Sequence, residues 1–343
     1  MKYHKVLLRY LLSGLALSYF PAFGQETTEK TDRVLDPKSC QEIKNRFVNL
    51  KRAHSLSPST FGYILISPSD KQVLELDESL TPLQPFGVEM GNQNRPESLF
   101  KYPLHSISTD SQVFVTDLFS QSVKIYSEQA SFEGEILLDQ RPRLSRFALR
   151  KELIAYTSDF PDCSIRILNT EGEIIRNLGK GFGDLRSIGD LFFLPNGQLL
   201  RIGNINPTIE LYDPQGDLVF EHNLTEYPKI QEAWEWAKNK HYLDTTKYSS
   251  LTIPIVNDAF VHHNKLYILL REFLNYPVKG KYLDSKKIIV FEIKESLIQY
   301  TDQFYLSEKY AEDDYSTFCI SKDGKELLAF NYLSKELCVF DLD

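Results

Sequence analysis

A short strand, a polar turn and a second strand recur along most of this chain. The clearest copy runs from His105 to Tyr126, and looser copies cover 147–178, 190–224, 257–293 and 316–343. A supersecondary unit that returns every ~40–50 residues is typical of the blades of a β-propeller. The repeat therefore predicts an all-β fold, and it leaves the function largely open.

The repeated strands predict one domain rather than several. They are rich in β-branched and aromatic residues, and turns such as Lys322-Asp-Gly324 separate them. We assign residues 43–343 to a six-bladed propeller and the polar stretch 25–42 to a flexible lead-in. The last strand lacks an outer neighbour, and Arg46–Leu50 is the predicted N-terminal strand that closes the propeller beside it.

The first 24 residues have the pattern of a signal peptide. Three basic residues precede an apolar stretch from Leu11 to Phe20, and Ala22-Phe-Gly24 supplies small residues where a signal peptidase cuts. We expect cleavage before Gln25 and a periplasmic or extracellular mature chain without a membrane span. An uncleaved anchor helix is the alternative.

The chain is acidic, which bears on its partners. Its formal net charge of −8 becomes −11 once residues 1–24 are removed, because they contain three basic and no acidic residues. A negative surface repels phosphate backbones, so we do not expect nucleic acid as a partner. The excess of carboxylates also serves the solubility of an exported domain.

Four cysteines stand at positions 40, 163, 319 and 338, without the spacing of a zinc site. Cys40 would reach Cys338 if the N-terminal strand pairs with the last one. The sequence leaves one disulfide and none as equal alternatives.

Blade two resembles a known repeat. The segment Pro96–Pro103, followed by strands at Val113–Asp117 and Val123–Tyr126, looks like a blade of the NHL type. Over roughly residues 45–343 the chain is similar to the exported six-bladed propellers, NHL-like or TolB-like, that are common in Bacteroidetes. The motif is structural, so the resemblance implies the fold and export rather than an activity.

Two long insertions interrupt the repeat. The first, 225–256, separates blades four and five, and it contains a predicted short helix with Trp234 and Trp236. The second, 271–286, contains Tyr276 and Tyr282. We expect both insertions on one rim, where aromatic side chains could grip a sugar or a peptide. The alternative is that Trp234 covers the insertion's own small core and Trp236 lies on the surface.

Basic residues precede several inner strands on the same side. They are Lys101, Arg141, Arg143, Arg146 and Arg186. Such a cluster could hold a carboxylate or phosphate group. It could equally form ion pairs with Asp184, Asp190, Asp313 and Asp314, which is the favoured interpretation.

Side chains of the types that bind metals stand at or near the starts of the inner strands. The candidates are His105, Asp190, Asn257 and Asp258, and the set lacks the Glu that propeller hydrolases use there. We therefore predict no metal site and no cofactor.

These observations favour a non-catalytic binding or interaction module of the cell envelope that binds its ligand at the loop-rich mouth near blades four and five, with an envelope protein, a peptide or a glycan as partner. The residues predicted to bind the ligand are Trp234, Trp236, Tyr276, Tyr282, Arg146, Arg186, His105 and Asp258. The alternative is a metal-assisted hydrolase, lactonase or lyase that acts on sugar-derived or peptide substrates.

Overall fold

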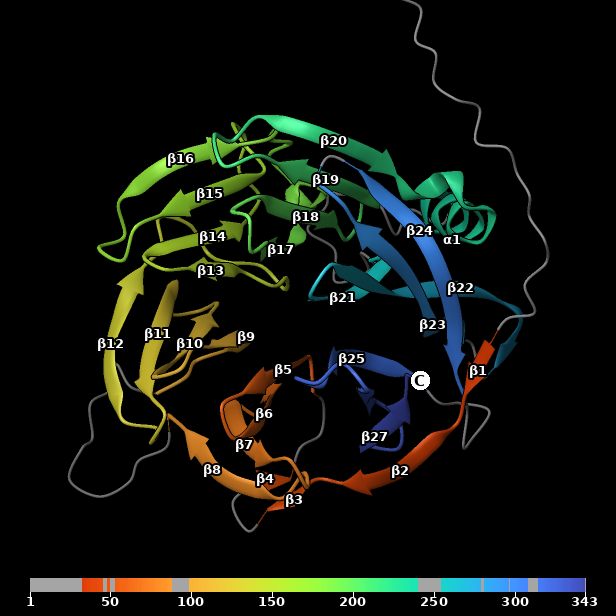
Figure 1. Ribbon diagram of the computed structural model, residues 1–343, viewed down its shortest axis with the longest axis horizontal. Helices are drawn as coiled ribbons and strands as arrows, with labels where there is room; N and C mark the ends of the chain where they lie inside the picture. Colours follow the sequence, from red (N-terminus) through yellow and green to blue (C-terminus); the bar gives the residue numbers. More distant parts are fainter. Residues whose placement is uncertain are drawn as a thin grey trace, which may run out of the picture. The chain divides into compact units, whose positions relative to one another are not determined.

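Six antiparallel sheets form the blades of the protein in a computed structural model; five contain four consecutive strands, and the sixth contains three consecutive strands and one from near the N-terminus (Figure 1). The structure describes residues 33–45, 48–49, 53–87, 99–239, 254–278, 281–295, 297–307 and 314–342. Residues 34–343 make one unit. The predicted six-bladed propeller is confirmed.

Blades 1 to 3 are simple up-and-down sheets in which each strand pairs with the next one along the chain. Their strands are β5 (Ser55–Ser59), β6 (Gly62–Ser67), β7 (Gln72–Asp77) and β8 (Pro82–Phe86); β9 (Pro103–Ser108), β10 (Gln112–Asp117), β11 (Ser122–Ser127) and β12 (Phe132–Leu137); and β13 (Ala148–Arg150), β14 (Leu153–Thr157), β15 (Ile165–Leu168) and β16 (Ile174–Leu178). In each blade the first strand is the innermost (Figure 1).

Blades 4 to 6 follow the same plan, and strands from the N-terminal part of the chain are added to blades 5 and 6. Their strands are β17 (Gly189–Phe193), β18 (Leu199–Gly203), β19 (Thr208–Tyr212) and β20 (Leu218–Asn223); β21 (Val256–His262), β22 (Lys265–Val278), β23 (Lys281–Ile293) and β24 (Ile298–Leu306), joined by β1 (Arg33–Leu35); and β25 (Tyr315–Ile320), β26 (Glu326–Asn331) and β27 (Glu336–Asp341), joined by β2 (Pro37–Glu42).

The remaining elements lie in the connections. A small hairpin is formed by β3 (Lys44–Asn45) and β4 (Val48–Asn49), and single-turn helices are η2 (Leu185–Ser187) and η3 (Leu224–Glu226). The α-helix α1 (Pro228–Asn239) lies between β20 and β21, as the helical insertion between blades four and five was predicted. Among the described residues, no helix combines the length and apolarity needed to cross a membrane.

The core consists of apolar layers between neighbouring blades. Each of the six clusters of buried apolar residues joins two adjacent sheets, for example Val115 of blade 2 with Ile64 of blade 1. Successive side chains of a strand point to opposite faces of the sheet, so apolar residues at neighbouring positions cover both faces of a blade. Every blade can therefore pack against two neighbours. The inner strands of the six blades lie next to one another around the axis (Figure 1).

The predicted closing strand was wrong. β2, not Arg46–Leu50, pairs with β27, and Val48–Asn49 pairs instead with Lys44–Asn45. Residues 33–42, which composition had assigned to the flexible lead-in, thus form β1 and β2. The sequence favoured an apolar segment as the closing strand. The outermost strand of a blade has one face toward solvent, however, so the polar β2 can occupy the position beside β27.

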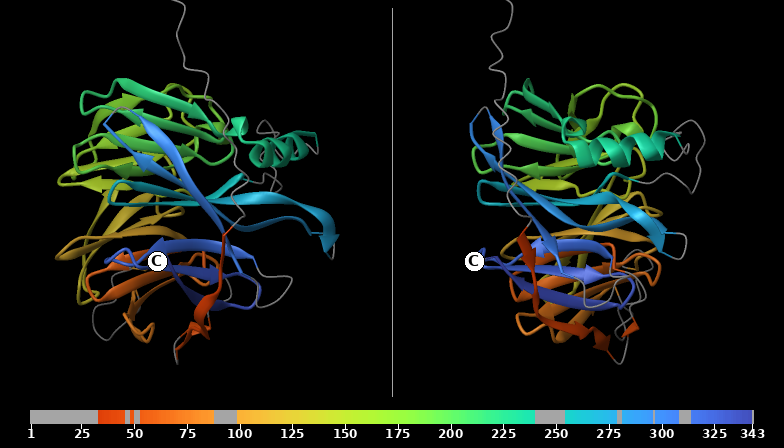
Figure 2. Two further views of the ribbon diagram at one scale, coloured as in Figure 1. Left: turned by 45° about the vertical axis from the view of Figure 1, so that its right-hand side comes forward. Right: turned by 90° about the vertical axis from the view of Figure 1, so that its right-hand side faces the viewer.

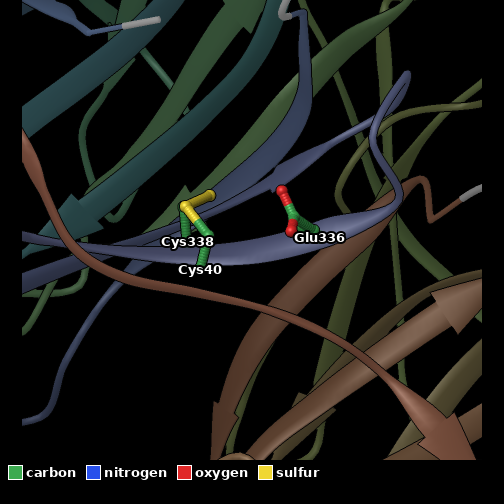
Figure 3. A group of neighbouring side chains, drawn as sticks. All are labelled: Cys40, Glu336 and Cys338. Carbon is green, nitrogen blue, oxygen red and sulfur yellow. A yellow bond between two sulfur atoms is a disulfide. The ribbon is translucent and has the colours of Figure 1, made fainter. Parts of the chain in front are cut away.

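A disulfide bond joins the two ends of the described propeller. Cys40 in β2 lies opposite Cys338 in β27, and the two are bonded across a sequence separation of 298 residues (Figure 3). Cys163 and Cys319 are free and buried. The alternative with one disulfide therefore holds, and the bond fixes the closing strand covalently.

We expect reduction of this bond to lower the free energy of unfolding by about 2–5 kcal/mol, because the closure of a very long loop in the unfolded chain is released. The measurement is urea denaturation with and without dithiothreitol. A C40S/C338S variant should have the stability of the reduced wild type and should not respond to the reductant. An equal response of both proteins would contradict the prediction.

Candidate functional site

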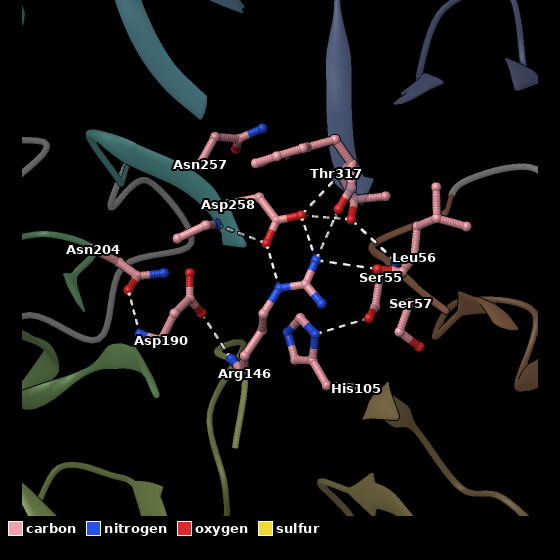
Figure 4. A network of polar contacts seen from close by, with 12 residues as sticks. Ser55, Leu56, Ser57, His105, Arg146, Asp190, Asn204, Asn257, Asp258 and Thr317 are labelled. Atoms are coloured by element: carbon pink, nitrogen blue, oxygen red, sulfur yellow. Dashed lines mark hydrogen bonds and ion pairs between the residues drawn. The ribbon is translucent and has the colours of Figure 1, made fainter. Parts of the chain in front are cut away.

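Polar side chains from all six blades meet at one depth along the axis. We call this set the polar layer, and its members are Ser55 (β5), His105 (β9), Arg146 (just before β13), Asp190 (β17), Asp258 (β21) and Thr317 (β25) (Figure 4). All six are buried. Since buried polar groups are costly unless they are paired, their hydrogen bonds decide what the layer can do.

Arg146 is the centre of the polar layer. Its Nε and Nη2 each lie 2.8 Å from a carboxylate oxygen of Asp258, a two-pronged ion pair between side chains that are only 7% and 3% exposed. Nη2 also contacts the carbonyl oxygens of Leu56 (3.1 Å) and Phe318 (3.0 Å). One guanidinium group of blade 3 is thus tied to blades 5, 6 and 1.

Asp258 has its hydrogen-bonding capacity filled. Besides Arg146, it accepts bonds from Thr317 Oγ1 (2.6 Å), from the Phe318 amide (3.0 Å) and from the Ala259 amide (2.9 Å). Burial alone would lower the pKa of Arg146, but the neighbouring Asp258 and Asp190 raise it. Asp258 is therefore fully satisfied by groups of the protein itself, which suits a structural role for the pair.

His105 and Asp190 occupy opposite flanks of Arg146. His105 Nδ1 lies 2.9 Å from Ser55 Oγ, and burial, helped by the charge of Arg146, holds the pKa of His105 well below its usual range. Asp190 Oδ1 accepts the Arg146 amide (2.7 Å), while Oδ2 is buried without a partner. Burial and the charge of Asp258 raise the pKa of Asp190 to about 7.

A cavity of about 320 Å³ begins at the polar layer. His105 and Arg146 form its floor, and its walls follow the inner strands to their far ends. Side chains that supply these walls are Ile107, Leu149, Phe192, Phe193, Phe260 and Val261, with the hydroxyl groups of Ser57, Ser106 and Ser108. The described lining contains no carboxylate and no thiol. A mostly apolar wall above a few polar atoms is typical of a small-molecule site.

The cavity opens at the end opposite to the two insertions. The cavity follows β21 toward Val261, near the end of that strand. α1 and the far part of the β22–β23 hairpin extend beyond the blades at the other end, where β21 begins (Figure 2). α1 contacts β22, so the insertions lie on one rim as expected. The cavity itself is a feature that the sequence did not indicate.

The predicted ligand-binding residues thus separate into two groups. His105, Arg146 and Asp258 meet in the polar layer. Trp234 and Trp236 are half-buried against the core shared by blades 4 and 5, and Lys238 Nζ lies 4.7 Å from the Trp234 ring centroid. The alternative is thus met only in that Trp234 covers a core: this core belongs to blades 4 and 5 rather than to the insertion, and Trp236 packs against it as well instead of lying on the surface. As ligand-binding residues the two tryptophans stay a prediction.

Of the other predicted residues, the arginines lie away from the layer. Arg186 is exposed and pairs with Asp184 (2.7 Å), as the ion-pair interpretation expected. Arg143 likewise pairs with Asp159. The side chains of Tyr276 and Tyr282, and residue Asp313, lie outside the described part of the structure.

Three of the four metal candidates converge, but around a cation that the protein supplies itself. The fourth, Asn257, donates to the carbonyl oxygens of Tyr315 and Ser316 and accepts from Arg271 instead. Arg146 lies among His105, Asp190 and Asp258, where a metal ion would have to be (Figure 4). Among the described residues, the ligand atoms of Cys40, Glu336 and Cys338 also lie within 4.8 Å of one another. Both sulfur atoms there are consumed by the disulfide, so neither is a thiolate ligand.

No known family profile and no curated protein matches the sequence. Solved structures match in fold. The WD40 domain of Pan2 from Neurospora crassa has 11% identity and a TM-score of 0.56, and the match covers 91% of this chain and 94% of that one. An inactive virginiamycin B lyase variant from Staphylococcus aureus, solved with quinupristin, has 12% identity and a TM-score of 0.51. That match covers 89% of this chain and 99% of the lyase chain.

Hydrazine synthase of Kuenenia stuttgartiensis is a further match, with 12% identity and a TM-score of 0.52, covering 86% of this chain and 96% of that one. Proteins that differ this much in function share the blade arrangement. At these identities the matches show the propeller fold alone.

The raised pKa of Asp190 predicts a specific dependence of stability on pH. Its carboxyl holds a proton more tightly in the folded chain, so its contribution to stability is full near pH 4 and is lost as pH rises toward about 7. A D190N variant should remove this loss and gain on the order of 2 kcal/mol relative to wild type between pH 4.5 and pH 8. The measurement is urea denaturation at several pH values.

The control is D110N, which changes an exposed carboxylate in a turn and should reproduce the wild-type slope. A D190N protein with the same slope as wild type would contradict the assignment of a strained buried carboxyl to position 190.

Proposed function

We propose that this protein is a non-catalytic binding module that receives an apolar group of a small ligand or a peptide in its axial cavity. The observation that carries the proposal is the combination of an apolar 320 Å³ cavity with a floor whose ion pair is already satisfied. A floor of this kind orients a ligand without supplying a reactive charged group. Six-bladed propellers commonly serve as interaction scaffolds.

The proposal includes export to the cell envelope. The signal-peptide pattern of residues 1–24 favours it, and the Cys40–Cys338 disulfide supports it because such bonds persist in oxidising compartments. Kinship with NHL-like or TolB-like exported propellers belongs to the same proposal. The three strands of blade 2 at the positions of that motif support it.

Catalysis is the second candidate function, and one observation favours it. The imidazole of His105 is held neutral and lines the cavity, so it could accept a proton from a bound substrate in a hydrolase or lyase reaction. We rank it second because Nδ1 pairs with a serine hydroxyl rather than with a carboxylate that would stabilise the imidazolium form. A metal-assisted reaction is less favoured still, since Arg146 occupies the centre of the layer.

Filling the cavity should abolish binding. Val261 is half-buried on the cavity wall, and V261W places an indole in that space. We expect fragments that bind wild type in a thermal-shift or NMR screen to lose at least tenfold in affinity. S108W, at another wall position, should have the same effect, which guards against misfolding of one variant.

The matched control is V219W, which makes the same change at an exposed position of the outer strand β20. It should bind the fragments like wild type. Fragments that bind V261W and S108W as well as they bind wild type would contradict a site in this cavity.

A further inference from the structure

Two nitrogen atoms at the floor of the cavity are not used by the polar layer. Nε2 of His105 and Nη1 of Arg146 make no hydrogen bond to any described residue, although both side chains are buried. Neither is sealed from solvent, because the fully buried unpaired atoms of the described residues lie elsewhere, for example at Asp190 Oδ2. Both residues line the cavity, and these two nitrogen atoms are the ones that the hydrogen bonds of the polar layer leave over.

The planar shape of the guanidinium explains why Nη1 is left free. Asp258 takes the edge formed by Nε and Nη2, and the carbonyl oxygens of Leu56 and Phe318 take Nη2 as well. Nη1 lies on the remaining corner. The Arg146 guanidinium carbon lies 5.5 Å from the centroid of the Phe260 ring, and Phe260 also lines the cavity. The free N–H groups are thus held in place at the boundary between polar floor and apolar wall.

The chemistry of this floor selects an oxygen acceptor. A guanidinium N–H forms charge-assisted hydrogen bonds with carbonyl and carboxylate oxygens, and it repels a cation. The described walls contain no carboxylate that could attract an amine. Asp258 is occupied by four partners, and the free oxygen of Asp190 is sealed.

We propose that the cavity binds an apolar ligand that ends in a carbonyl or carboxylate group, with its oxygen on Arg146 Nη1 and beside His105 Nε2. The inference rests on the proposed binding function and adds the chemical class of the ligand. The apolar body of the ligand packs against Ile107, Phe192 and Phe260, which the lining places above the floor. The neutral state of His105 allows an acid or an amide at this position without a second positive charge.

Three probes of one shape test the inference: 4-phenylbutyrate, 4-phenylbutyramide and 4-phenylbutylamine. The oxidised protein should bind the acid and the amide, and the amine should bind at least tenfold more weakly. The ¹⁵N resonances of His105 should shift with the acid and the amide. Tighter binding of the acid than of the amide identifies a carboxylate ligand, and tighter binding of the amide identifies a carbonyl ligand.

Two substitutions of His105 separate the role of Nε2 from packing. H105N keeps a polar atom near the position of Nδ1 and lacks Nε2, so the acid and the amide should bind about three- to tenfold more weakly. H105Q reaches the position of Nε2 and should restore most of the affinity. Equal binding by H105N and wild type would overturn the assignment.

The outcomes distinguish the inference from the function on which it rests. If the amine binds as well as the acid and the amide, and V261W abolishes all three, the cavity is a binding site but the inference is wrong. If none of the probes binds at millimolar concentration, both are overturned. If wild type and V219W prefer the acid or the amide over the amine, and V261W does not bind them, the result supports both the binding function and the inference.

Discussion

The ion pair between Arg146 and Asp258 is the interaction on which the centre of this propeller depends. Blades pack side by side through apolar layers, but their inner strands present buried polar groups to the axis. One guanidinium satisfies a carboxylate and two carbonyl groups from three other blades. Because breaking a buried pair leaves an uncompensated charge, the layer holds the blades in one arrangement.

The same layer separates the two ends of the molecule. On one side lie the insertions, whose tryptophans are engaged with the core of blades 4 and 5. On the other side lies the cavity, which His105 and Arg146 line where it meets the layer. In our proposal Arg146 serves two purposes: Nε and Nη2 maintain the structure, and Nη1 contacts the ligand. That division favours binding over catalysis at this site.

Much of the fold could be predicted because strand alternation and turn residues such as Gly324, with φ of 76°, are local properties. The closing strand could not, since β2 is polar and is held by pairing and by Cys40 rather than by hydrophobic pattern. His105, Arg146 and Asp258 were identified from their positions near strand starts. Thr317 and the cavity residue Phe260 were missed, because only the fold brings equivalent positions of different blades together.

The most direct test of this account is a double-mutant cycle on the central pair, with unfolding free energies of wild type, R146M, D258N and the double variant measured in urea at pH 7. The account predicts that each single change costs about 3–5 kcal/mol, since each leaves one buried partner unpaired. The double variant should be clearly less destabilised than the sum of the two. Additive effects, or single losses below about 1 kcal/mol, would contradict the claim that this pair organises the propeller axis.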